Sequence, residues 1–136
     1  VDKAKEASKI RPLIPQLALV SEPQSYVGSN GNTVAAKDID VTARMFNNGK
    51  PHHTYAVTAA MCLAAATQVE GTIPFRLSND LSSNVSVAIG HPKGRIDIQT
   101  VVEQNAGGSE VKELSVDRTA RPLHQGQFFR KKLIDI

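Results

Sequence analysis

The hydrophobic positions of the chain predict one long helix. From Thr54 to Val69 nearly every residue is apolar, and the few polar ones do not make a polar face. A helix that is apolar all round is normally buried. Thr54 is a candidate N-cap and Gly71 a candidate C-terminal cap, and at 1.5 Å per residue the helix would be about 24 Å long. We therefore expect a buried helix at the centre of the domain.

Alternation of apolar and polar residues predicts strands on both sides of this helix. The clearest case is residues 39–45, where every second residue is apolar, as in a half-buried strand. Residues 3–9 read as the polar end of a helix that the prolines at 12 and 15 stop. Further strands are predicted at 16–20, 72–75, 84–89, 96–102, 111–120 and 127–133. The pattern predicts an α+β fold with antiparallel sheets curved around one long buried central helix.

Composition limits the class of protein. The 136 residues suffice for one domain with a hydrophobic core. The net charge of +3 is too small to argue for nucleic acid, and four Phe, two Tyr and no Trp argue against a stacking platform for bases. The basic residues at 130–132 are interpreted as a solvated chain end. We expect no nucleic-acid partner.

The lone cysteine and the lack of long apolar runs bear on location. One cysteine, Cys62, excludes an intramolecular disulfide and favours a reducing compartment, so we expect a cytoplasmic protein. No apolar run approaches membrane length and no signal peptide is visible, so no membrane association is expected. Because Cys62 lies inside the apolar helix, we expect its thiol to be buried and inert.

Two histidines, His52 and His53, directly precede the predicted helix. The first turn of a helix presents free N–H groups and a partial positive charge, which suit a bound carboxylate. Imidazole can also exchange a proton near neutral pH. The pair therefore predicts an anion site with acid/base capacity, and the alternative is that both histidines only line a turn.

Other polar residues carry weaker signals. Arg118 and Arg121 lie at a strand end, where they would either bind an acidic substrate or form ion pairs between the last strands. His91 is interpreted as a turn residue of a hairpin connection at 90–94, with its side chain bonded to the backbone. The four histidines show no metal-ligand spacing, so we expect no metal site.

Several motifs, in order, resemble the C-terminal part of the PrpF family. The resemblance runs from about residue 13 to residue 129. Its segments are 38–45 (DIDVTARM), 49–52 (GKPH), 56–62 (AVTAAMC), 70–72 (EGT), 90–94 (GHPKG) and 118–121 (RTAR). The family comprises cofactor-independent isomerases of unsaturated polycarboxylic acids such as aconitate and methylitaconate. It resembles diaminopimelate epimerase, with two similar domains, each a sheet barrel around a central helix, and an active site between them.

This resemblance implies a role for each candidate residue. His52 falls at the cleft-facing end of the central helix and is the candidate catalytic residue. His53, Thr54, Arg118 and Arg121 are candidate substrate-binding residues. The family's catalytic lysine and cysteine lie in an N-terminal domain that this chain lacks, and Cys62 is not that cysteine.

The chain is therefore expected to be one half of an enzyme. Residues 1–136 would form a single domain, with 1–12 as an inter-domain connector. The expected partners are a small polycarboxylate and the missing N-terminal domain, or a second copy of the chain, with no cofactor. The alternative is a non-catalytic domain of the same fold that binds a small acid or a partner chain.

Overall fold

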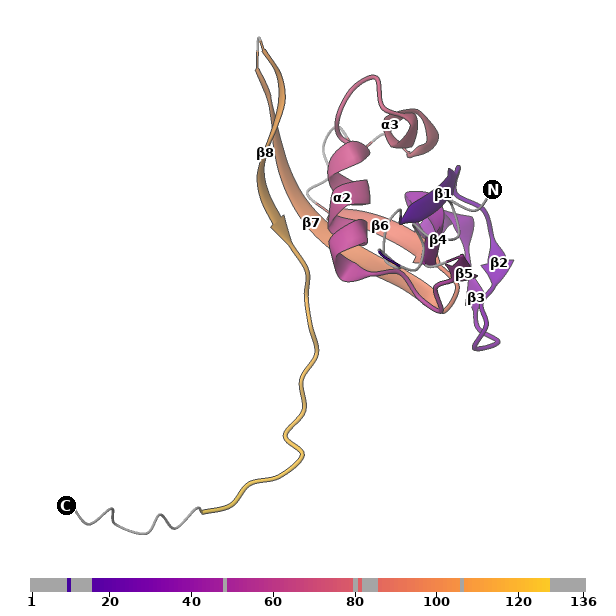
Figure 1. Cartoon of the computed structure of the whole chain (residues 1–136), viewed down its shortest axis with the longest axis vertical. Helices are drawn as coiled ribbons and strands as arrows, with labels where there is room; N and C mark the ends of the chain where they lie inside the picture. Colours follow the sequence, from indigo (N-terminus) through magenta and orange to yellow (C-terminus); the bar gives the residue numbers. More distant parts are fainter. Residues whose placement is uncertain are drawn as a thin grey trace, which may run out of the picture.

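Six of the strands form one curled sheet, whose two edges are open in the described part of the chain. The computed structural model describes residue 10 and residues 16–47, 49–79, 81, 86–105 and 107–127. The order across the sheet is β1, β4, β6, β7 and β8, with β5 also paired to β4. These strands are β1 (Leu17–Ser21), β4 (Val41–Asn47), β5 (Lys50–Pro51), β6 (Ser86–His91), β7 (Gly94–Asn105) and β8 (Gly108–Ser115). Figure 1 shows the β7–β8 hairpin at one side of the body and β1 at the other.

One pair of strands differs from the expected antiparallel arrangement. β4 and β6 run parallel, with Val41 opposite Ile89 and Thr42 opposite Gly90. Parallel neighbours need a long crossover connection, and the segment that holds both longer helices supplies it. The other pairings in this sheet are antiparallel. The α+β class is confirmed, with a mixed, half-barrel sheet.

Alternate residues of three neighbouring strands form the core. β4 confirms the strand predicted at 39–45, and the predicted segments at 16–20, 84–89, 96–102 and 111–120 correspond to β1, β6, β7 and β8 with shifted ends. The fully buried strand residues are Val41, Ala43, Met45, Val87, Ile89 and Ile98. Residues 3–9, 84–85 and 128–133 lie outside the described part, and residue 127 is not in a strand.

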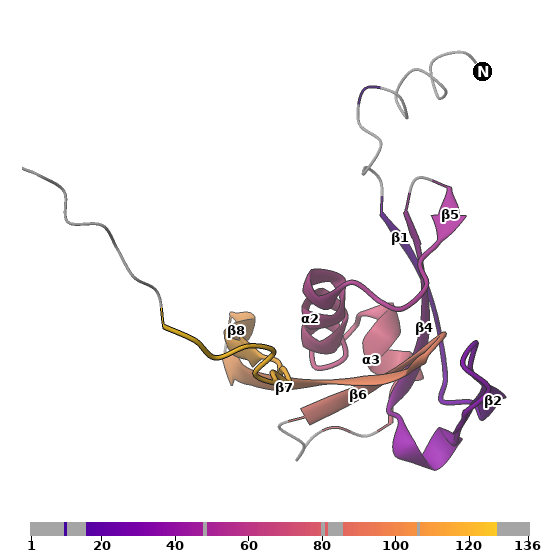
Figure 2. The same ribbon diagram turned by 90° about the horizontal axis from the view of Figure 1, so that it is seen from below.

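Helix α2 packs on the concave face of the sheet but is shorter than expected. It spans Val57–Ala66, and its buried residues are Ala60, Leu63 and Ala64. Figure 2 shows α2 lying above β6 and β7, with β4 rising beside it. The N-cap residue is Ala56, so the expectation that Thr54 caps the helix is wrong. The reason is local: the Thr54 amide donates to His52, which holds these residues in a turn before the helix.

One side of α2 is open, which corrects the prediction for Cys62. Thr58 and Cys62 are exposed, because the described part of the sheet covers the helix from one side only and no pairing there joins its edge strands β1 and β8. The helix also ends at Ala66, with Thr67 as its C-cap, rather than at Gly71. Gly71 instead adopts a positive φ of 86° in the turn that follows. A helix enclosed on all sides is not seen in the described residues.

The strand predicted at residues 72–75 is wrong. This segment is helix α3, Ile73–Leu77, which packs beside α2 and β1. Thr72 is its N-cap, and the Thr72 hydroxyl accepts a hydrogen bond from the Phe75 amide at 3.1 Å. Pro74 in the first turn suits a helix start. The strand was predicted because Thr72, Ile73 and Phe75 are residue types that favour strands.

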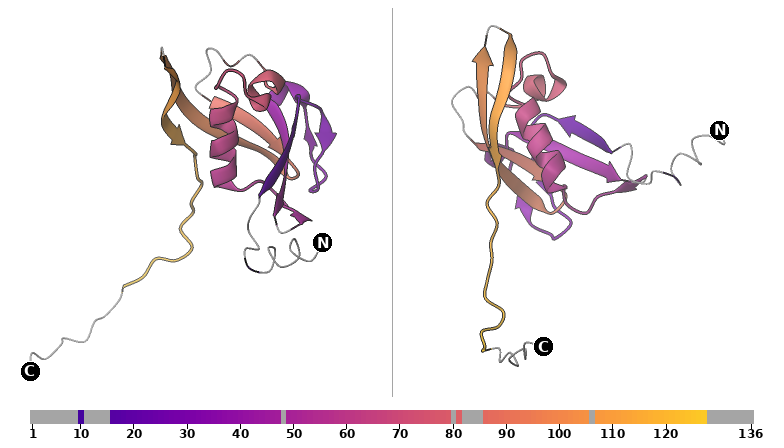
Figure 3. Two further views of the ribbon diagram at one scale, coloured as in Figure 1. Left: turned by 45° about the horizontal axis from the view of Figure 1, so that its top comes forward. Right: turned by 60° about the vertical axis from the view of Figure 1, so that its left-hand side comes forward.

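Two smaller features flank the sheet. The ribbon β2 (Tyr26–Val27) and β3 (Thr33–Val34) is followed by the 3₁₀ helix η1 (Ala36–Asp38). After β8 the chain from 116 to 127 is extended and leads away from the body (Figure 3). The strand predicted at 111–120 therefore ends at Ser115.

Candidate functional site

The loop between β5 and α2 positions His52. The backbone N–H of His52 donates to the Met45 carbonyl of β4 at 2.7 Å, and this bond fixes the loop to the sheet. Its side-chain Nδ1 accepts a hydrogen bond from the Thr54 amide at 3.2 Å. His52 and Thr54 are half-buried, whereas His53 is exposed. Ala56 provides no side-chain cap, so the first N–H groups of α2 are available to a ligand.

A further histidine, His91, belongs to this region although it was interpreted as a turn residue. It is the last residue of β6, only 9% exposed, and its Nδ1 accepts a hydrogen bond from the Lys93 amide at 3.2 Å. Burial lowers the pKa of His91, and the charges of Arg44 and His52 lower it further, whereas a backbone contact with Arg95 opposes the shift. His91 is therefore held neutral close to His52.

The sequence carried a signal for His91. In β6 the side chains of Val87 and Ile89 face the core. Because side chains alternate along a strand, His91 shares their face. Because Gly90 and Pro92 flank His91, the sequence predicted a turn at this position instead of the end of a strand.

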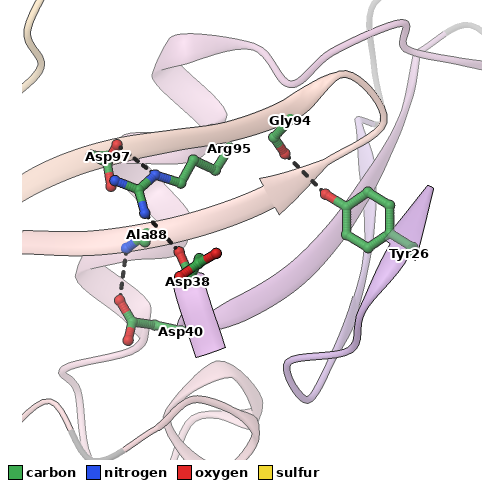
Figure 4. Close-up of polar contacts among 7 residues, drawn as sticks. All are labelled: Tyr26, Asp38, Asp40, Ala88, Gly94, Arg95 and Asp97. Carbon is green, nitrogen blue, oxygen red and sulfur yellow. Dashed lines mark hydrogen bonds and ion pairs between the residues drawn. The ribbon is translucent and has the colours of Figure 1, made fainter. Parts of the chain in front are cut away.

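Tyr26 and Arg44 hold the turn that carries His91. The Tyr26 hydroxyl lies 2.7 Å from the His91 carbonyl and 2.9 Å from the Gly94 carbonyl; Figure 4 shows the bond to Gly94. The Arg44 guanidinium lies 4.4 Å from the centre of the Tyr26 ring and donates to the Gly90 carbonyl at 3.2 Å. Burial raises the pKa of Tyr26 against the opposing effect of Arg44, so the phenol stays protonated.

Gly90 shows how closely this turn is packed. A Cβ atom at this position would lie 2.7 Å from Ile39 Cδ1 and 3.1 Å from the Tyr26 hydroxyl. Ile39 is fully buried and has little room to move. The glycine allows the ribbon side chain Tyr26 to reach the carbonyls of the turn.

Of the two predicted arginines, Arg118 lines a hollow beside α2 and Arg121 does not. Arg118 is exposed and lines a hollow of about 470 Å³ together with Val57, the first residue of α2, and the ion-paired Arg95 and Asp97. Figure 4 shows that ion pair on β7. Arg121 is exposed in the extended segment and does not line the hollow. Neither arginine forms an ion pair within the described residues.

A larger hollow of about 720 Å³ lies between β1, α2 and the start of α3. Its lining is mainly apolar and includes Leu17, Leu19, Tyr55, Cys62 and Ile73. Burial raises the pKa of Tyr55, and the neighbouring Cys62 adds to the shift. This apolar groove has no cationic side chain in its lining, so it does not suit a polycarboxylate.

Two kinds of feature are absent from the described residues. No group of three or more His, Cys, Asp or Glu side chains there is arranged to hold a metal ion. Within the same residues, no helix has the length and apolar character needed to cross a membrane.

Comparison with known proteins decides the family. The family model described as PrpF protein matches residues 1–131. The chain belongs to the PrpF family. This PrpF chain is 35% identical to 3-methylitaconate isomerase of Eubacterium barkeri over 129 residues, which are 94% of the chain and 33% of the relative. It is also 35% identical to 2-methyl-aconitate isomerase of Shewanella oneidensis over 112 residues, 82% of the chain and 28% of the relative.

A solved structure supports the same relationship. The crystal structure of methylitaconate-delta-isomerase matches the PrpF chain with a TM-score of 0.69 and 31% sequence identity. The match covers 82% of this chain and 31% of the other. The chain thus spans about a third of the length of the relatives that it matches.

Proposed function

We propose that this PrpF chain is the C-terminal half of a cofactor-independent isomerase of unsaturated polycarboxylic acids, of the aconitate or methylitaconate type. The observation that carries the proposal is the position of His52. It lies between the β4 strand and the uncapped start of α2, with buried His91 close by. The names of the relatives supply the substrate class.

The reaction would be a proton transfer with a double-bond shift. A base removes a proton from an allylic carbon beside a carboxylate, and the electron pair delocalises toward that carboxylate. Reprotonation at the far end of the allyl system then moves the double bond. No atom is gained or lost, so this scheme requires no redox cofactor.

The proposed roles of the side chains follow from their places. His52 contacts the reacting part of the substrate, while His53, Thr54 and the first N–H groups of α2 bind a carboxylate. Arg118 lies beside the first residue of α2, where its guanidinium is suited to a second carboxylate. Arg121 follows three positions later and would reach a substrate only if the extended segment folds back.

We propose that a further domain completes the enzyme. Residues 1–136 would be a single domain, with 1–12 as the connector to the N-terminal part that the longer relatives possess. Covering the exposed Thr58 and Cys62 would make α2 the central helix of a closed barrel. Self-association is the other way to cover this face. A cytoplasmic location fits the single cysteine.

The alternative proposal is a non-catalytic domain that binds a small acid or a partner chain. The apolar groove beside α2 favours a partner chain, because its exposed Leu17 and Leu19 are costly to leave in water. Mixing the chain with the N-terminal two thirds of the Eubacterium barkeri relative discriminates the readings. Recovered isomerase activity would favour the enzyme half.

The direct test uses purified residues 1–136 and 3-methylitaconate. We expect binding, measured by nuclear magnetic resonance (NMR) titration, without turnover, because one wall of the site is missing. Robust turnover by this chain alone would contradict the half-enzyme assignment. Failure to bind 3-methylitaconate, aconitate or the inert tricarboxylate tricarballylate would contradict the proposed function itself.

A further inference from the structure

The hydrogen bond to His52 fixes where its proton lies. The Thr54 backbone N–H donates to His52 Nδ1 at 3.2 Å. A backbone amide can only donate, so Nδ1 must present a lone pair, and the neutral ring carries its single proton on Nε2. The Thr54 hydroxyl, 3.4 Å from the same nitrogen, can donate or accept and adds no constraint.

This arrangement is the reverse of that found in a histidine base. A histidine that abstracts a proton needs its lone pair toward the substrate, and an acceptor such as a carboxylate usually holds the N–H on the other ring nitrogen. Here the group behind Nδ1 is a donor. Within the described residues, no acidic side chain forms an ion pair with His52.

His91 repeats the arrangement on the neighbouring strand. Its Nδ1 accepts from the amide of the residue two positions later, Lys93, also at 3.2 Å. The charged or titratable groups that act on it are Arg44 and His52, both cationic when charged. The backbone of Arg95 competes for its proton, so His91 is the less available of the two donors. At this end of the sheet, half-buried His52 is thus the more available donor to an anion.

We infer that His52 is a hydrogen-bond donor, through Nε2–H, to a substrate carboxylate and does not remove the allylic proton. The inference rests on the proposed function and specifies the role of His52 within it. The donated bond strengthens as negative charge moves onto the carboxylate oxygen, and His52 keeps its proton throughout. A base from the proposed further domain then takes the allylic proton and returns one to the other carbon.

The first test reads the proton position without any substrate. In the 15N-labelled 136-residue chain at mildly alkaline pH, we expect His52 Nδ1 to resonate as an unprotonated nitrogen. A scalar coupling across the hydrogen bond should link it to the Thr54 amide nitrogen. Exposed His53 should show no such coupling. A proton on His52 Nδ1 would overturn the inference even if polycarboxylates bind.

The second test uses substitutions that separate donation from acid/base exchange. Glutamine places an N–H near the position of Nε2 but does not titrate. We expect His52→Gln to bind tricarballylate within about threefold of the unchanged chain, whereas His52→Ala should lose roughly tenfold to hundredfold, the effect of one hydrogen bond to a charged group. His124→Ala, in the exposed segment, is the control.

The outcomes separate the two proposals. Equal loss in His52→Gln and His52→Ala would overturn the donor role while leaving the proposed function intact. Tricarballylate binding that neither substitution weakens would also overturn the donor role and leave the proposed function intact. Absence of tricarballylate binding by the unchanged chain would instead overturn the proposed function, and the inference with it.

Discussion

Helix α2 borders two surfaces of opposite chemical character. Before its start lies His52, held by the Thr54 amide, and the charge of His52 acts on the buried His91 at the end of β6, where Tyr26 and Arg44 fix the nearby turn. Along its side lies the apolar groove, lined by Leu17, Leu19 and Cys62 without a comparable set of polar contacts. In the proposed function the first surface binds a small anion, whereas the second is a face that further protein would cover. Two surfaces beside the same helix therefore differ in chemistry because of the side chains that the neighbouring strands and loops supply.

The largest expected difference concerns stability. Ile98 is fully buried under α2, whereas Ile73 at the groove is 60% exposed. Ile98→Ala should lower the free energy of unfolding by about 2–5 kcal/mol, because it leaves a cavity in the core. The matched Ile73→Ala should change it by less than about 1 kcal/mol. Urea unfolding of both variants makes the comparison, and equal losses would show that the groove is closed in solution.

Removing one hydroxyl should loosen the polar end. Tyr26→Phe removes the partner of the His91 and Gly94 carbonyls and should cost on the order of 1–3 kcal/mol in thermal or urea unfolding. Tyr55→Phe is the matched control, because the Tyr55 hydroxyl makes no hydrogen bond within the described residues; its effect should stay within about 0.5 kcal/mol. If Tyr55→Phe lowered the free energy of unfolding as much as Tyr26→Phe, the Tyr26 hydrogen bonds would not stabilise this turn.

The buried His91 should also make the free energy of unfolding depend on pH. Folding lowers the pKa of His91 below its ordinary value near 6.5, so the unfolded chain takes up the proton first as the pH falls. The stability contributed by neutral His91 is complete above about pH 6.5 and is lost as the pH falls through the folded pKa. Unfolding free energies at about pH 8 and pH 5.5 should differ less in His91→Gln than in the unchanged chain. An unchanged difference would place His91 in solvent.

The smallest effect is expected at Cys62. Because this thiol is exposed, Cys62→Ser should change stability by no more than about 0.5 kcal/mol. A thiol reagent should label Cys62 in the folded chain, and addition of the N-terminal two thirds of a relative should slow labelling if that part covers the groove. A thiol that reacts only after unfolding would restore the sequence-based expectation of burial.

Strand alternation allowed much of the sheet to be predicted, but long-range packing did not follow from the sequence. β4 was found because its apolar residues recur at every second position, and the motif order identified the family. The burial of Cys62 was predicted wrongly because an apolar helix was expected to be enclosed, whereas enclosure depends on strands elsewhere in the chain. Thr72 and Pro74 are typical of a helix start, but a strand was predicted there because Ile73 and Phe75 favour strands.

The candidate site was predicted in part for the same reason. His52 was placed beside the helix by its proximity in sequence, and the role assigned to it remains a prediction. His91 was missed because it comes close to His52 only through the parallel pairing of β4 and β6, which are separated by both longer helices. The orientation of each imidazole depends on an amide two residues later. A bond between His91 and the backbone was expected of a turn residue, whereas the same contact at His52 was not predicted.

The most direct test of the central claim is an NMR titration of residues 1–136 with tricarballylate, following the amide and histidine signals of both surfaces. We predict that the signals of His52, Thr54 and His91 shift together with a single saturating dependence on ligand concentration, while those of Leu19 and Cys62 stay unchanged. Shifts confined to the apolar groove, or no shift at His52, would contradict the claim that the polar end of α2 receives the polycarboxylate.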